Sequence, residues 1–353
     1  RVNVDDCWAN IDRSENGTLV GNTTRFPSGM KALADYVHGK GLQLGIYNDM
    51  GTKTCGGYPG ECKDKNCSLP GYMGVDAEVY AQWGIDSIKV DGCNVFQTSD
   101  VLSRGYRFFG DQLNRTGRPI MYSCSWPDYI RLNREPVNYT LIGDTCNMWR
   151  MYDDIQDSWE SVLGIIDWVG NNGGKGSPMQ VTAGPGRWND PDMLIIGNYA
   201  LSETQARSQL ALWCIMAAPL MMGNDLRHLA PNMKEILTNK EALAVDQDPL
   251  GVQGWRVAQD TGLCTAHDVW MKPLSNGDVA VVLFNRGVCG THTKLNFSWE
   301  LVELPAAKAM QVRDLFAGKD VGTFTGSFSG FVDPDGVRML RLSPAPGFAG
   351  MTQ

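Results

Sequence analysis

Two charged residues of the chain, Lys89 and Asp91, have the types and the spacing to do chemistry. Apolar and polar residues alternate from Ile85 to Asp91, and Gly92 follows, which is the pattern of a strand that ends in a turn. Side chains two apart on a strand share a face, so the Lys89 ammonium would lower the pKa of Asp91 and keep it ionised. An ionised carboxylate in this place suits a covalent nucleophile. A buried ion pair at the end of a core strand is the simpler alternative.

A second carboxylate, Asp154, follows another predicted strand and lies near Arg150 in the sequence. Glycoside hydrolysis with retention uses one ionised and one protonated carboxyl group about 5 Å apart. Asp91 suits the first role and Asp154 the second. Asp153 and Asp154 could instead cap a helix that begins at Ile155.

The carboxylates must be positioned by regular elements, and the sequence predicts alternating strands and helices. Strand and helix alternate about seven times, at roughly thirty residues per unit, and polar residues gather where the strands end, as in a (β/α)8 barrel. A doubly wound sheet would need a Gly-rich phosphate loop after its first strand, and the sequence has none there. We predict a (β/α)8 barrel over residues 1–245, with its first βα unit missing. The predicted strands are 2–7, 42–47, 85–91, 119–124, 139–146 and 219–222, and the predicted helices are 30–38, 76–83, 102–114, 155–169, 203–217 and 231–243.

The sequence pattern changes after residue 249. Short apolar runs at 268–271, 279–285, 309–314 and 338–342 alternate with Gly, Asn and Asp turns. No helical pattern is clear in this part. We predict a C-terminal antiparallel β-sandwich domain over residues 250–353.

Charge and composition exclude several partners. The net charge is −8, which argues against nucleic acid and anionic membranes. No apolar run reaches the length of a membrane span. No signal peptide is present, and the chain opens directly in a strand-like run, as a mature or trimmed chain would. Six N-x-Ser/Thr sequons suggest glycosylation on a secretory route, at Asn16, Asn22, Asn66, Asn114, Asn138 and Asn296.

The cysteines indicate disulfides rather than a metal site. None of the ten Cys forms a CxxC pair or a Cys/His cluster, so with the sequons they indicate an oxidising compartment. Cys214 is the exception, because its apolar surroundings favour a buried thiol. The chain has only four His, and none falls within the Asp motifs, so we expect no metal and no cofactor.

Eight motifs in order resemble those of glycoside hydrolase family 27, the lysosomal α-galactosidases and α-N-acetylgalactosaminidases. The resemblance covers nearly the whole predicted barrel and continues more weakly into the β domain. The motifs are Val4-Asp5-Asp6-Cys7-Trp8, Arg25-Phe26-Pro27, Gly45-Ile46-Tyr47-Asn48-Asp49, Lys89-Val90-Asp91-Gly92-Cys93, Tyr122-Ser123-Cys124-Ser125-Trp126-Pro127, Cys146-Asn147-Met148-Trp149-Arg150, Asp153-Asp154-Ile155-Gln156-Asp157-Ser158-Trp159 and Trp188-Asn189-Asp190-Pro191-Asp192-Met193.

The resemblance implies a retaining exo-glycosidase, lysosomal or secreted, that removes terminal α-linked galactose-type residues from glycans. It implies that Asp91 is the nucleophile and Asp154 the acid/base. The implied substrate contacts are Asp5 and Asp6 at the 4- and 6-hydroxyls, Lys89 at the 3- and 4-hydroxyls, Arg150 and Asp192 near the 2-position and the anomeric side, Tyr47, Tyr129 and Cys55 in the pocket wall, and Ser125 with Asp128 at the 2-position.

The resemblance also implies disulfides Cys55–Cys93 and Cys124–Cys146. The family's first βα unit, absent here, would supply an aromatic platform and a partner for Cys7. Cys62 and Cys67 lie in an unusual insertion, and we pair them locally. Cys264–Cys289 is the fourth expected disulfide, which leaves Cys7 and Cys214 as thiols.

Ser125 and Asp128 decide the expected specificity. The animal galactosidases carry Glu and Leu at these places, and the acetylgalactosaminidases carry Ser and Ala. Ser125 leaves room for an acetamido group, whereas Asp128 is larger than Ala and charged. We expect α-N-acetylgalactosaminide turnover with α-galactoside turnover retained, and a strict α-galactosidase is the alternative. A buried unpaired carboxylate is costly, so we expect Arg150 or a sugar donor near Asp128.

Two other classes of function compete with this interpretation. A non-catalytic sugar-binding protein of the same fold would not turn over a chromogenic α-galactoside. A metal-dependent hydrolase would lose its activity in EDTA. The sequence leaves the natural glycan open, and a homodimer is the assembly we consider.

Overall fold

The computed structural model describes residues 1–345, which fall into two compact units. The first unit is Arg1–Tyr152, and the second covers the described residues from Asp153 onward. The predicted β domain extends to residue 353, so its residues 346–353 lie outside the described part.

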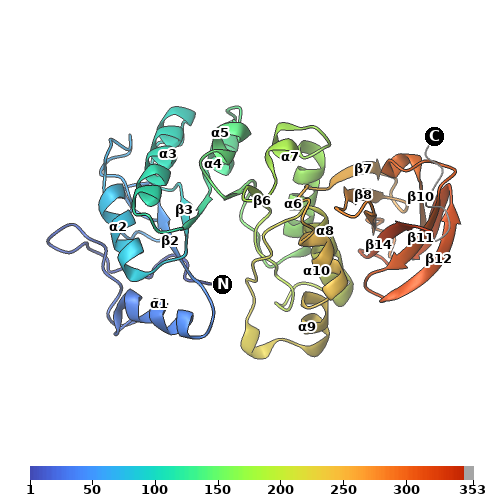
Figure 1. The fold of residues 1–353 in the computed structure, drawn as a ribbon, viewed down its shortest axis with the longest axis horizontal. Coiled ribbons are helices and arrows are strands. Elements are labelled where there is room, and N and C mark those ends of the chain that lie inside the picture. Colours follow the sequence, from blue (N-terminus) through green and yellow to red (C-terminus); the bar gives the residue numbers. More distant parts are fainter. Residues whose placement is uncertain (346–353) are drawn as a thin grey trace. The chain divides into compact units, whose positions relative to one another are not determined.

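The first unit is built on five parallel strands in sequence order (Figure 1). They are β1 (Val2–Asn3), β2 (Leu44–Asp49), β3 (Ser87–Asp91), β4 (Met121–Cys124) and β5 (Met148–Arg150). Helices α1 (Gly29–Gly39), α2 (Met73–Trp83) and α3 (Ser99–Arg115) connect them and bury their apolar stripes in one core with the sheet. Because parallel strands in register end together, Asp49 of β2 lies beside Asp91 of β3.

The strand predicted at 139–146 is wrong. This segment forms the short helix α5 (Tyr139–Gly143), and the strand β5 begins after it. Asn138 starts the helix, since its side chain accepts the backbone N–H of Leu141 at 3.0 Å. A further helix that the sequence reasoning missed, α4 (Trp126–Leu132), begins directly after β4 with Pro127 in its first turn.

The second unit begins with helices α6 (Trp159–Asn172) and α7 (Pro178–Thr182), strand β6 (Trp188–Asp190) and helix α8 (Glu203–Ile215). The 3-10 turn η1 (Leu226–His228) and helices α9 (Pro231–Leu237) and α10 (Lys240–Asp246) follow. The single helix predicted at 231–243 is therefore two, because Asn239 accepts the N–H groups of Glu241 and Ala242 and starts a new helix. The strand predicted at 219–222 is reduced to one bridge between Leu194 and Met222.

The rest of the second unit consists of antiparallel sheets (Figure 1). One sheet has the order β12-β11-β14-β9-β8-β7 and the other pairs β10 with β13. Their apolar faces share one core around Trp299 and Phe328. Four of these strands were predicted, at 268–271, 279–285, 309–314 and 338–342. They are β8 (His267–Pro273), β9 (Val279–Asn285), β11 (Ala309–Asp314) and β14 (Val337–Pro344). The prediction missed the other four, which are β7 (Trp255–Asp260), β10 (Thr293–Ser298), β12 (Lys319–Thr325) and β13 (Ser327–Val332).

The helices of residues 1–345 are all too short or too polar to cross a bilayer.

Candidate active site

Asp91 is the residue around which the polar groups of the first unit gather. It ends β3, and its side chain is 17% exposed. Its Oδ1 accepts hydrogen bonds from the Tyr129 hydroxyl at 2.7 Å and from the Gly92 N–H at 3.1 Å. Its Oδ2 accepts the Tyr47 hydroxyl at 3.1 Å. Both oxygens therefore have donors, while part of the carboxylate stays open.

The environment keeps Asp91 ionised. Burial by itself raises the pKa of Asp91, but the charge of Lys89, 3.9 Å from Oδ2, and the donors named above outweigh it and leave that pKa below its ordinary value. The Lys89 ammonium also lies 3.5 Å from the Asp5 carboxylate, which is half exposed. One cation thus links the ends of β1 and β3.

The two tyrosines act as donors only. Burial, followed by the negative charge of Asp91, raises the pKa values of Tyr47 and Tyr129 far above those of ordinary phenols. They keep their protons at every working pH. Each hydroxyl also lies 3.3 Å from one sulfur of the Cys55–Cys93 disulfide, Tyr47 from Cys55 Sγ and Tyr129 from Cys93 Sγ.

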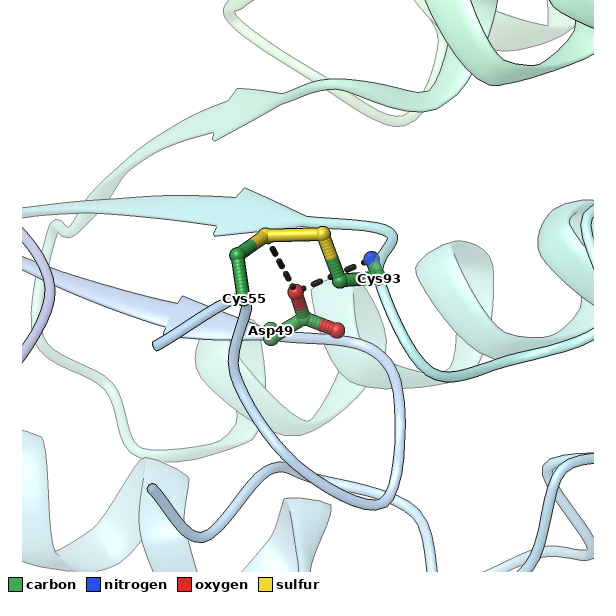
Figure 2. A group of neighbouring side chains, drawn as sticks. All are labelled: Asp49, Cys55 and Cys93. Carbon is green, nitrogen blue, oxygen red and sulfur yellow. Dashed lines mark hydrogen bonds between the residues drawn. A yellow bond between two sulfur atoms is a disulfide. The ribbon is translucent and has the colours of Figure 1, made fainter. Parts of the chain in front are cut away.

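Asp49 lies beneath this disulfide, as Figure 2 shows. Its side chain is fully buried, and Oδ2 is 3.0 Å from the Cys93 N–H and 3.5 Å from Cys55 Sγ. Although Asp49, Cys55 and Cys93 form a group with the spacing of a metal site, the two sulfurs are bonded to each other and are not thiolate ligands.

Asp5 and Asp6 follow β1 and differ in what they do. Asp6 accepts the backbone N–H of Gly56 at 2.7 Å and of Cys7 at 2.6 Å. It therefore holds the loop that carries Cys55 against the end of β1. Asp5 accepts the N–H of Asp6 at 2.9 Å and contacts Lys89.

Ser125 and Asp128 lie where β4 passes into α4. The Ser125 N–H donates to the carbonyl of Val90 at 3.0 Å, which brings Ser125 next to Asp91, and its hydroxyl makes no capping bond to the helix. Asp128 accepts both Nε and Nη2 of Arg131, at 3.0 and 2.7 Å. Arg131 is thus one partner of Asp128, and the expectation of Arg150 or a sugar donor near this carboxylate stays a prediction. The Arg131 guanidinium lies 4.5 Å from the centre of the Tyr152 ring.

Asp154 and Asp192 belong to the second unit. Asp154 is exposed, in the loop before α6. Asp192 is buried, with a left-handed backbone (φ 78°), and its Oδ2 accepts the N–H of Ile155 at 2.8 Å. Asp192 therefore fixes the residue that follows Asp154.

The structure brings most of the predicted residues together within each unit. In the first unit Asp5, Lys89, Tyr47, Tyr129, Cys55 and Ser125 surround or adjoin Asp91, and in the second Asp192 adjoins the Asp154 loop. Arg150, at the end of β5, donates to the carbonyl of Tyr152 at 3.1 Å. Sequence reasoning counted Asp49 among the polar residues at strand ends but gave it no role in the site. It missed Arg131, for which the sequence offered no signal.

The structure contains the four expected disulfides. They are Cys55–Cys93, Cys62–Cys67, Cys124–Cys146 and Cys264–Cys289, with Cys7 and Cys214 as free thiols. Of the six sequon asparagines, Asn22 is half-buried and the other five are exposed.

Comparisons with known proteins identify the family of this chain. Residues 1–248 match the family model described as alpha galactosidase A, and residues 265–342 match the alpha galactosidase C-terminal beta sandwich domain. The alpha-N-acetylgalactosaminidase of Gallus gallus is 47% identical, over 97% of this chain and 81% of that protein. Human alpha-galactosidase A is 47% identical over 81% of this chain and 63% of that protein. The structure of alpha-galactosidase I from Mortierella vinacea, 30% identical, superposes with a TM-score of 0.86, covering 97% of this chain and 87% of that one.

The fold and these matches define a glycoside hydrolase. More particularly, the chain belongs to the alpha galactosidase A family, glycoside hydrolase family 27, and has the parallel sheet of a TIM-type barrel followed by an antiparallel β-sandwich domain.

Proposed function

We propose that the chain is a retaining exo-glycosidase that removes terminal α-linked N-acetylgalactosamine and galactose from glycans. The observation that carries the proposal is the state of Asp91: it is partly open, ionised, and held by two tyrosine hydroxyls beside Lys89. A carboxylate that is fixed and charged in this way can attack an anomeric carbon without first losing a proton.

The reaction proceeds in two displacements. Asp91 attacks the anomeric carbon and forms a glycosyl ester while Asp154 gives its proton to the departing glycosidic oxygen. Asp154 then takes a proton from water, and the water attacks the same carbon and releases Asp91. Two inversions leave the α configuration. In this proposal Asp5, Asp6 and Lys89 bind the hydroxyls of the sugar, and Arg150 and Asp192 contact it near the 2-position and the anomeric carbon.

The test separates the two carboxylates. Asp91→Asn should abolish turnover of every α-glycoside, because no glycosyl ester can form. Asp154→Asn should reduce turnover far more for aglycones that leave poorly than for a dinitrophenyl leaving group, which needs no proton. The measurements are kcat/KM with a series of leaving groups, and NMR of the first sugar released.

Asp157→Asn is a matched control in the same loop, because Asp157 binds the backbone of Tyr199 and has no proposed role in catalysis. Its kcat should stay near that of the wild type. Near wild-type activity of Asp91→Asn, or a β sugar as the first product, would contradict the assignment.

Three wider expectations accompany this function. The family matches to 1–248 and 265–342 support a catalytic domain at 1–245 and a β domain at 250–353. The disulfides and exposed sequons support a lysosomal or secreted location. A homodimer is our proposed assembly, to be measured by sedimentation.

A further inference from the structure

Asp49 is a buried acid that the proposed mechanism does not use. It ends β2 directly beside Asp91, and its side chain has no exposed surface. Its Oδ1 accepts the Gly51 N–H at 2.6 Å, and its Oδ2 accepts the Cys93 N–H at 3.0 Å. One carboxyl group therefore binds the turn after its own strand and the turn after the strand of Asp91.

We propose that Asp49 is a positioning residue for Asp91, whose carboxyl group fixes the turn 91–93 and the disulfide against which both tyrosine donors rest. This inference depends on the proposed role of Asp91 as the nucleophile.

A short chain of contacts links Asp49 to the nucleophile. The Cys93 N–H that Asp49 binds belongs to the residue whose sulfur is 3.3 Å from the Tyr129 hydroxyl. The other sulfur, of Cys55, is 3.3 Å from the Tyr47 hydroxyl. Each of these hydroxyls also donates to one oxygen of Asp91. A shift of the disulfide would therefore move both donors away from the carboxylate.

The burial of Asp49 and its place beside Asp91 favour the protonated form of its carboxyl group. Its Oδ2 lies 3.5 Å from Cys55 Sγ, as drawn in Figure 2. A disulfide sulfur has no hydrogen to donate, so this contact is a hydrogen bond only if Asp49 donates to the sulfur. Burial, followed by the charge of Asp91, raises the pKa of Asp49 well above its ordinary value and outweighs the two backbone N–H groups. Two adjacent carboxyl groups thus share one negative charge, and Asp91 carries it.

The test is the pH profile of Asp49→Asn. We measure kcat and KM from acid to neutral pH with a dinitrophenyl α-galactoside, so that the acid role of Asp154 does not shape the curve. If Asp49 is neutral, the acidic limb, which reports ionisation of Asp91, should stay within about 0.3 pH unit of the wild type. The Cys93 N–H would lose its acceptor, so kcat should fall about tenfold with KM nearly constant.

Two results would overturn the inference. A move of the acidic limb to lower pH by about one unit or more would mean that an ionised Asp49 had been raising the pKa of Asp91. An unchanged kcat would mean that Asp49 does not position the nucleophile.

Further variants separate positioning from stability. Asp86→Asn, at the opposite end of β3, removes an acceptor for Leu44 N–H and Arg118 and should lower the melting temperature without changing kcat. Asp49→Ser is a second neutral variant with the same expected acidic limb. If neither Asp49 variant folds, Asp49 supports the whole unit and the inference fails. An active Asp91→Asn would instead refute the proposed function itself.

Discussion

The side chains at the start of α4 give this site its individual character. Asp128 does not stand alone: the Arg131 guanidinium binds it through two nitrogens and in turn lies over Tyr152. A carboxylate neutralised in this way costs less to bury than a free one, and it is held back from moving. Ser125, one turn earlier, is the small neighbour of this pair. We therefore propose that specificity at the 2-position depends on the space that Ser125 leaves.

Ser125→Glu should reverse the preference for the 2-substituent. The longer acidic side chain would fill the space for an acetamido group while it can still accept a hydrogen bond from a 2-hydroxyl. We expect kcat/KM for an α-N-acetylgalactosaminide to fall about a hundredfold and that for an α-galactoside to change by less than about tenfold.

Ser125→Ala is the control for that variant, since it removes the hydroxyl without adding bulk. Losses of less than about tenfold on both substrates are expected, as for one neutral hydrogen bond. Equal losses on both substrates in Ser125→Glu would show that residue 125 does not face the 2-position.

Some residues of the candidate site could be predicted from the sequence, and others could not. Asp91, Lys89 and the tyrosines follow motifs that can be recognised at once, and the structure joins them by hydrogen bonds or short ionic contacts. Arg131 could not be predicted, because an arginine in the last turn of a short helix has many surface alternatives. Arg131 follows Asp128 by three residues, and only the folded helix brings the two side chains together.

At the scale of elements, the two disulfides nearest each other in sequence have different tasks. Cys55–Cys93 joins the loop after β2 to the turn after β3 and contacts both tyrosines of the site. Cys62–Cys67 is a buried disulfide that closes a small, largely exposed loop, and its Cys67 Sγ lies 3.9 Å from the carbonyl of Met50. The first therefore affects both stability and the geometry of Asp91, whereas the second affects stability alone.

The double variant Cys55→Ala/Cys93→Ala should lose more than about tenfold in kcat. Because the disulfide joins cysteines that are 38 residues apart, its removal should lower the free energy of unfolding by about 4 kcal/mol. The matched double variant Cys62→Ala/Cys67→Ala, with a separation of 5, should lose about 2 kcal/mol and keep its kcat. Urea unfolding and initial rates below the unfolding transition measure both quantities. A fully active Cys55/Cys93 variant would contradict the positioning role.

Long periodic elements were predicted well, and short ones were not. Helices α1, α2, α3 and α8 and strands β2, β3 and β4 lie within a few residues of their predicted ranges. The segment Tyr139–Gly143 has too few residues for a period to be recognised, and the cap by Asn138 decides its helix. The break between α9 and α10 likewise depends on one side chain, Asn239.

For the molecule as a whole, the family and the order of barrel and sandwich were recognisable from the sequence, because the motifs recur at strand ends throughout. The buried charges of the interior were not recognisable. Lys272 is fully buried and donates to the carbonyl of Val245 at 2.7 Å. Asp246, next to it, has a buried Oδ1 without a hydrogen-bond partner.

Asp246 should make the fold more stable in acid than at neutral pH. Burial raises its pKa from 3.8 to about 7, although the charge of Lys272 opposes the shift. The native state then holds a proton that the unfolded chain has lost, so this contribution is complete below pH 4 and is lost as the pH rises to about 7. The loss amounts to about 4 kcal/mol.

Asp246→Asn should remove that slope. Its free energy of unfolding should exceed that of the wild type near pH 7 and approach it near pH 4, as measured by urea titration at both values. Asp35→Asn, which breaks an exposed pair with Lys31, is the control and should change stability by less than about 1 kcal/mol at either pH. A wild-type slope that persists in Asp246→Asn would assign it to other groups.

The unequal donors on Asp91 have a consequence for the regiochemistry of the glycosyl ester. Oδ1 accepts two hydrogen bonds, from Tyr129 and Gly92. Oδ2 accepts one, from Tyr47, and lies 3.9 Å from the Lys89 ammonium, which is beyond hydrogen-bond distance. On esterification one oxygen forms the bond to the sugar and becomes a weak hydrogen-bond acceptor. The other becomes a carbonyl oxygen that still accepts hydrogen bonds. Because Oδ2 accepts fewer hydrogen bonds than Oδ1, esterification of Oδ2 weakens fewer of them. The sugar should therefore be bonded to Oδ2, and the carbonyl should remain on Oδ1. A crystal structure of the enzyme trapped with a 2-fluoro sugar would show which of the two oxygens bears the ester.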